Sequence, residues 1–256
     1  MRPRPCLLLM LAALTACAPR PPQPAPAAPA APAPPPAPAP PPAPTPPATP
    51  IQLGPGLLVD RQARELRIDA EVAIDRGWLE QAVCATGTRD HETLLVTRVP
   101  ASRIHAGLLL LGLEPGHPGS WREVPGAAGA PGTVERVPPA GAPIALLVQV
   151  GDAAPVPLSA WIAHPTGRAA FPSQPWVFAG SRMRRVPASA GGGERYAADA
   201  SGSIVGIVTF GDECIACTEV FADRAEVDAP QWQARTGTVP NPGTAATLIV
   251  RPRDAH

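Results

Sequence analysis

The segment from residue 18 to residue 50 constrains this chain most, because it contains little besides proline and alanine. Proline fixes φ and lacks an amide hydrogen, so such a segment cannot form sheet ladders and favours the extended polyproline II conformation. At about 3.1 Å per residue it would reach about 100 Å when fully extended. We predict a disordered Pro/Ala linker over residues 17–50 that acts as a spacer. A proline-rich ligand for a recognition domain is the less favoured alternative.

Residues 1–16 have the layout of a secretory signal, with Arg2 and Arg4 before an apolar stretch from Leu7 to Leu14. The stretch is too short to span a bilayer, which takes about 20 apolar residues, so cleavage is expected. The run LTAC that ends at Cys17 resembles the lipobox of bacterial lipoproteins, in which the cysteine carries the lipid. We therefore predict a lipoprotein signal peptide and a lipidated Cys17, with an ordinary signal and a coincidental cysteine as the alternative.

Two or three acyl chains on one residue would hold the protein firmly to a membrane, whereas a single chain binds only marginally. The predicted partner is thus a membrane, reached through the lipid anchor. Ala18, rather than an aspartate, follows Cys17. This is typical of lipoproteins sorted to the outer membrane, so we expect the periplasmic face of that membrane.

Residues 51–256 remain for a globular domain, which is enough chain for a core of useful size. Removing Arg2 and Arg4 with the signal leaves 19 basic against 21 acidic residues, a net charge of −2. Nucleic acid is therefore excluded as a partner, because phosphate binding needs a clustered excess of positive charge.

Alternating apolar residues predict most of the strands. Leu66, Ile68, Ala70, Val72 and Ile74 alternate with polar residues, which is typical of a strand with one buried face. After a turn at 75–77, a strand over 78–85 is expected to pair back on the first, and a third covers 93–99. Further strands are predicted over 144–150, 156–163, 176–182, 195–198, 203–210 and 245–250.

One short helix is expected after Pro100, with Ser102 as its N-cap and Gly112 at its end. Ile104, Leu108 and Leu111 would form its buried stripe. Residues 115–142 are rich in Gly, Pro and Ala and are expected to be a long surface excursion. The fold class is thus α+β, a strand-dominated single domain with one short helix.

The densest polar cluster is Arg89, Asp90, His91 and Glu92, between two apolar strands. An imidazole near carboxylates could serve as a general base or hold a metal. Neighbours in an extended chain point to opposite faces, however, so a polar turn in which Arg89 pairs with a carboxylate is the favoured interpretation. His105 on the helix is a further partner for this cluster, or a hydrogen-bonded core histidine.

Three cysteines remain in the domain, Cys84, Cys214 and Cys217, and the last two form a C-x-x-C motif. A redox pair or half of a zinc site would be the functional interpretations, but acidic neighbours would raise the thiol pKa and no second C-x-x-C is present. A structural Cys214–Cys217 disulfide or buried thiols are favoured, and the sequence leaves these two open.

Several runs resemble the YdjY-domain family: 84–92 (CATGTRDHE), 104–116 (IHAGLLLLGLEPG), 176–181 (WVFAGS), 196–199 (YAAD) and 243–252 (GTAATLIVRP). The resemblance implies an exported or lipid-anchored bacterial protein and supplies no reaction or cofactor. It places Cys84, His91, Glu92 and His105 at signature positions, which implies a shared pocket that includes Arg89 and Asp90. Cys214 and Cys217 depart from the family pattern.

Because no catalytic motif occurs, the expected function is a noncatalytic envelope module that binds an envelope protein or a small ligand. The alternative is a metal- or thiol-dependent site, redox or metal-binding, around Cys84, His91, Glu92 and His105.

Overall fold

The computed structural model of the chain describes residues 49–126, 132–167, 169–172, 175–222 and 227–253. The predicted signal, the lipidated Cys17 and the linker up to residue 48 lie outside these residues. Within the described part, no helix has both the length and the apolar character needed to cross a membrane.

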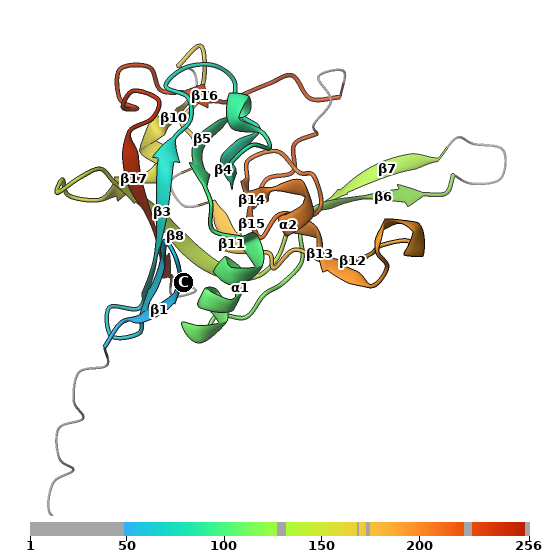
Figure 1. Cartoon of the computed structure of the whole chain (residues 1–256). Coiled ribbons are helices and arrows are strands. Elements are labelled where there is room, and N and C mark those ends of the chain that lie inside the picture. Colours follow the sequence, from blue (N-terminus) through green and yellow to red (C-terminus); the bar gives the residue numbers. More distant parts are fainter. Residues whose placement is uncertain (1–48, 127–131, 168, 173–174, 223–226, 254–256) are drawn as a thin grey trace, which may run out of the picture. The chain divides into compact units, whose positions relative to one another are not determined.

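The main sheet closes on itself through eight strands. They follow the order β3 (Glu65–Val72), β17 (Ala245–Pro252), β8 (Ala142–Gln149), β11 (Trp176–Phe178), β15 (Ile215–Cys217), β14 (Ser203–Gly206), β4 (Gln81–Ala85) and β5 (Thr93–Thr97), and β5 pairs again with β3 (Figure 1). β1 and β2 extend the sheet from β3, and β9 pairs with β8. Closure pairs the edges that an open sheet would leave exposed, and the inward side chains form one apolar core. The predicted strand-dominated single domain with one short helix is confirmed.

The strands are β1 (Ile51–Gly54), β2 (Leu57–Asp60), β3 (Glu65–Val72), β4 (Gln81–Ala85), β5 (Thr93–Thr97), β6 (Ser120–Val124), β7 (Thr133–Val137), β8 (Ala142–Gln149), β9 (Val156–Pro157), β10 (Ile162–Ala163), β11 (Trp176–Phe178), β12 (Met183–Arg185), β13 (Glu194–Tyr196), β14 (Ser203–Gly206), β15 (Ile215–Cys217), β16 (Gln233–Ala234) and β17 (Ala245–Pro252). The helices are α1 (Ala101–Leu110) and α2 (Ala197–Ser201), and the 3-10 turns are η1 (Asp90–Glu92), η2 (Leu158–Trp161) and η3 (Ala188–Ala190).

The predicted pairing of the strand over 78–85 with the strand over 66–74 is wrong. β3 has the expected buried face, with Leu66, Ile68 and Val72 inside. It pairs with β2, β17 and β5 but not with β4, which lies between β5 and β14. Alternation of apolar residues fixes which face of a strand is buried but carries no information on its neighbour, so the pairing was open.

Two of the pairings in the closed sheet are parallel, β4 with β5 and β14 with β15. Parallel neighbours normally need a connection of about a dozen residues or more. Here residues 86–92 and 207–214 alone make the two connections. We call them the first and the second parallel connection.

Helix α1 starts two residues earlier than expected. Its N-cap is Pro100 rather than Ser102, and the Asp199 carboxylate of α2 accepts a hydrogen bond from the Ser102 backbone N–H at 2.8 Å. An aspartate distant in sequence thus does the work that a local cap residue would do, which a local pattern cannot reveal. Gly112 follows the helix with φ of 79°, as expected for a residue after a helix end.

The excursion over 115–142 contains strands that the sequence did not indicate. β6 and β7 pair along their whole length and project from the closed sheet as a hairpin (Figure 1). Their side chains are mostly exposed, so no buried stripe marks them in the sequence. The strand predicted over 156–163 is instead β9, η2 and β10 in succession.

Candidate functional site

The polar signature 84–92 forms the end of β4 and the first parallel connection. The Asp90 carboxylate accepts hydrogen bonds from the backbone N–H of Gly87, at 2.9 Å, and of Thr88, at 3.2 Å. The Thr88 hydroxyl donates to the Ala85 carbonyl at 2.6 Å, and Gly87 has φ of 83°, a conformation that favours glycine. These bonds fold the chain back sharply enough for β5 to run parallel to β4.

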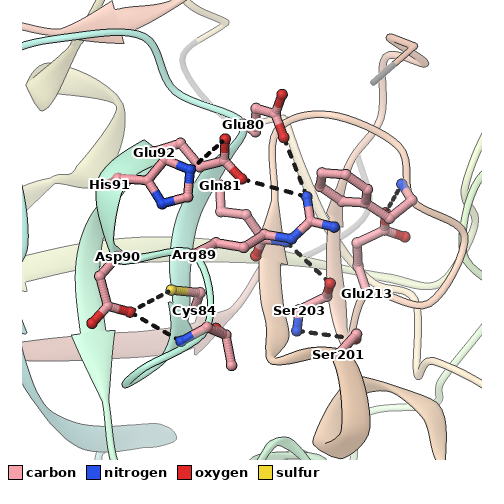
Figure 2. A network of polar contacts seen from close by, with 12 residues as sticks. Glu80, Gln81, Cys84, Arg89, Asp90, His91, Glu92, Ser201, Ser203 and Glu213 are labelled. Carbon is pink, nitrogen blue, oxygen red and sulfur yellow. Dashed lines mark hydrogen bonds and ion pairs between the residues drawn. The ribbon is translucent and has the colours of Figure 1, made fainter. Parts of the chain in front are cut away.

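Arg89 lies between two carboxylates and above an aromatic ring. Its guanidinium is 3.2 Å from Glu80 and 3.5 Å from Glu92, and it stacks over Phe210 at 3.6 Å from the ring centroid (Figure 2). The expectation that Arg89 pairs with a carboxylate in a polar turn is met by this geometry. Because Phe210 belongs to the second parallel connection, Arg89 also joins the two connections.

His91 and Cys84 occupy opposite extremes of exposure. The His91 side chain is 79% exposed and its Nε2 is 3.6 Å from Glu92. The Cys84 thiol is buried beneath the connection, with Sγ 3.9 Å from Asp90 Oδ1. Burial raises the pKa of Cys84, so its reactive thiolate is disfavoured.

The second parallel connection repeats the device of the first in a buried setting. Glu213 Oε1 accepts from the backbone N–H of Phe210 and from that of Gly211, the latter at 3.0 Å. Glu213 is buried, and its other oxygen has no hydrogen-bond partner among the described residues. Loss of solvent raises the pKa of Glu213 above 4.5, although the backbone hydrogen bonds oppose this.

A buried polar pair lies between the two connections. Gln81 of β4 donates to the Ser203 hydroxyl of β14 at 3.1 Å, and both residues are inaccessible to solvent (Figure 2). The Ser203 N–H in turn donates to Ser201 Oγ at 3.3 Å. The polar network therefore links two neighbouring strands of the closed sheet.

His105 belongs to a different network. Its Nδ1 is 3.0 Å from the Tyr196 hydroxyl, which donates to the Gly180 carbonyl at 2.9 Å. The ring also meets Phe178 edge to face at a centroid distance of 4.9 Å. Burial lowers the pKa of His105 and raises that of Tyr196, so both groups are neutral near pH 7. This is the geometry of a hydrogen-bonded core histidine.

The predicted ligand set does not come together. Among the residues that the structure describes, no three His, Cys, Asp or Glu side chains gather into a group that could hold a metal ion. Asp90, His91 and Glu92 lie in the first connection and Cys84 lies beside it at the end of β4, whereas His105 pairs with Tyr196.

Cys214 and Cys217 are free, buried thiols. Of the two alternatives that the sequence left open, the structure contains the buried thiols and no disulfide. Burial raises the pKa of each thiol to about 12, and the Glu219 charge adds to this effect at Cys217. The reactive thiolate form of both cysteines is therefore disfavoured near neutral pH.

A groove lies beside the end of β5 and was not indicated by the sequence. Two hollows of about 350 Å³ and 480 Å³ share Thr86 and the stretch 97–99 in their walls. Asp69 and Glu71 of β3 and Asp199 of α2 also line it. Each hollow has the size of a small-ligand site, and together they are the β5 groove.

Several residues of these networks were missed by sequence reasoning, notably Gln81, Ser203 and Phe210, and Tyr196 was noted only as part of the run 196–199 that resembles the family. They are isolated in the sequence and gain partners only through strand order. Glu213 was considered only for its charge near the cysteines. The sequence Phe210-Gly211 before it is a turn signal that could have suggested its role.

The comparisons with known proteins agree with the sequence resemblance. The YdjY domain matches residues 57–251, which include both parallel connections, α1 and the closed sheet. No curated protein and no solved structure matches the chain. Because the match covers well over half of the sequence, the chain belongs to the YdjY domain family.

Proposed function

We propose that this chain is a lipid-anchored module of the bacterial cell envelope that binds a protein or small ligand without catalysing a reaction. The apolar run before Cys17 supports export and lipidation, and Ala18 supports the periplasmic face of the outer membrane. The Pro/Ala linker is a disordered spacer that lets the domain reach away from the bilayer.

The β5 groove is the observation that carries the binding role. Arg98 projects from the chain just after β5 and has no ion pair or hydrogen bond among the described residues. The Asp69 and Glu71 side chains across the groove are likewise without ion-pair partners within the described part of the chain. On the same strand, by contrast, Glu65 pairs with Arg67 and Arg251.

Unpaired groups of both signs in one groove suit a ligand that also carries both signs, such as a peptide segment with acidic and basic side chains. The residues that the sequence marks as chemical are used differently. Asp90 and Glu213 hold turns, and the buried thiols have raised pKa values. This use of the polar residues supports a binding role over a catalytic one.

Crosslinking of the full-length chain in cells, followed by purification, tests the binding role. Arg98→Gln is expected to remove specific partners because it deletes the unpaired cation of the groove. Arg184→Gln is the matched control, since Arg184 of β12 is also exposed and lies outside the groove. Identical partners for both variants would contradict the proposal, as would turnover by the purified protein in a substrate screen.

Cell fractionation tests the anchor separately. The wild-type chain is expected in the outer-membrane fraction with acyl chains on Cys17, detected by mass spectrometry of the N-terminal peptide. Cys17→Ser removes the only thiol at that site and is expected to prevent acylation. An intact N-terminus from Met1 in the wild-type protein would contradict lipidation.

A further inference from the structure

The C-terminal end of α1 exposes apolar side chains that the core does not use. Ile104 and Leu108 are buried, whereas Leu109 is 47% exposed and Leu110 is 42% exposed. Leu111 follows at the helix end and is only partly buried. The three consecutive leucines at this helix end thus leave apolar surface exposed to solvent, and the core of the domain does not use this surface.

Two arginines border these leucines. Arg61 and Arg64, in the turn between β2 and β3, line a hollow of about 480 Å³ together with Leu109, Leu110 and Leu111. We call the surface formed by these five residues the leucine–arginine face.

The two arginines of this face keep their charge unpaired. Within the part of the chain that the structure describes, neither guanidinium makes an ion pair or a hydrogen bond. The nearest carboxylates along the sequence are committed elsewhere. Asp60 accepts from the backbone N–H of Gln62 at 2.9 Å and of Ala63 at 2.8 Å, and Glu65 pairs with Arg251 at 2.8 Å.

The face lies close to β1, the first described strand of the domain. β1 begins at Ile51, which pairs with Val59 two residues before Arg61. The same hairpin contacts α1, since Arg103 donates to the Leu53 carbonyl at 3.2 Å. β1 and α1 accordingly lie toward the same end of the domain (Figure 1).

We propose that the leucine–arginine face docks on an anionic phospholipid surface, with the leucines in the headgroup region and Arg61 and Arg64 against lipid phosphates. Apolar side chains flanked by cations are the composition of membrane-surface helices. The proposal rests on the proposed anchor in one respect. A lipid on Cys17 would keep the domain within reach of the bilayer, so weak docking becomes effectively intramolecular.

An environment-sensitive dye at residue 110 tests this in a chain that cannot be lipidated. The chain from Ala18 to His256 lacks Cys17, and its three thiols are buried, so Leu110→Cys creates the one readily labelled site among the described residues. Met183→Cys is the matched control. Met183 is 57% exposed and flanked by arginines on β12, but it lies outside the face.

With vesicles of phosphatidylglycerol and phosphatidylethanolamine, the dye at residue 110 should shift to the blue and brighten, and the dye at residue 183 should not. Phosphatidylcholine vesicles should give little response. Arg61→Gln and Arg64→Gln in the labelled chain should each weaken apparent vesicle binding about fivefold. Added salt should also weaken vesicle binding by the chain that keeps both arginines, because it screens their attraction to the lipid phosphates.

A response at residue 183 equal to that at residue 110, or no response at either, would overturn the proposal. A shift at residue 110 that depends on protein concentration without vesicles would overturn it too, because a second copy would then cover the face. These outcomes are separate from those for the proposed function. The test chain carries no acylation site, and the fractionation of the wild-type protein does not depend on the face.

Discussion

The first and the second parallel connection solve the same backbone problem in different surroundings. In each, one carboxylate accepts hydrogen bonds from two successive backbone amides and so tightens a connection between parallel strands, Asp90 in the first and Glu213 in the second. Asp90 lies near the surface, whereas only 1% of Glu213 is exposed. The same hydrogen-bonding arrangement therefore leaves its carboxylate near solvent in the first connection and buries it in the second.

The comparison also explains why the polar signature is misleading as chemistry. The first connection concentrates charged residues where solvent can reach them, and this run of residues resembles a catalytic or metal-binding motif in the sequence. The second connection has the group whose pKa is raised by burial, yet its sequence drew attention only for its cysteines. A dense polar run is thus a weaker guide to an unusual environment than burial is.

The largest effect is expected for Glu213→Ala. Two partly buried backbone amides would lose their acceptor and a void would remain in place of the buried side chain, so the free energy of unfolding should fall by about 3 kcal/mol. Urea unfolding of the chain from Ala18 to His256 at pH 7 measures this. Glu219→Ala, which removes an exposed carboxylate nearby, should change stability by less than about 0.5 kcal/mol. Equal losses for the two variants would break the comparison.

A smaller loss, about 1 to 2 kcal/mol, is expected for Asp90→Ala, because water can replace part of the lost hydrogen bonding at a half-buried turn. Asp90→Asn keeps one acceptor oxygen and should lose less. The same unfolding experiment compares all three proteins. If Asp90→Ala cost as much as Glu213→Ala, burial would not be the difference between the connections.

The pH dependence of the unfolding free energy should show the effect of burial in the second connection. Burial raises the folded-state pKa of Glu213 above its usual value, so its contribution to stability is present at low pH and is lost as the pH rises through the folded-state pKa. Glu213→Gln cannot ionise and should lack this loss. The difference in unfolding free energy, wild type minus variant, should therefore fall from pH 4.5 toward neutral pH. A constant difference would show that Glu213 is not desolvated.

The smallest effect is expected for His91→Ala, less than about 0.5 kcal/mol, since the side chain is largely exposed and its contact with Glu92 is solvated. Thermal or urea unfolding would detect a larger change. A loss near 2 kcal/mol would mean that His91 supports the first connection as Asp90 does.

The sequence located the helix and seven of the eight strands of the closed sheet, because periodicity reports burial. The buried face of β3 and the apolar alternation of β8 are examples. The sequence-based prediction failed where a strand or a helix end interacts with residues distant in the sequence. β4 was assigned to β3, the α1 cap was sought in Ser102 instead of Asp199, and the exposed β6–β7 hairpin had no buried stripe to mark it.

The candidate site shows the same division. The sequence indicated that 84–92 is a polar turn in which Arg89 meets a carboxylate, and this geometry is present. It also placed His105 near the cluster, whereas the helix directs this ring toward Tyr196. The β5 groove could not be anticipated, because its walls come from β3, β5 and α2.

By itself, the sequence determined the family, the segments able to form strands and the region too rich in proline to join a core. These properties depend on residue type and on spacing between near neighbours. The tertiary structure alone decided that β3 meets β5, that Glu213 is buried and that Leu109 and Leu110 stay exposed. Those outcomes depend on which distant segments close the sheet, and closure is a property of the whole chain rather than of any local pattern.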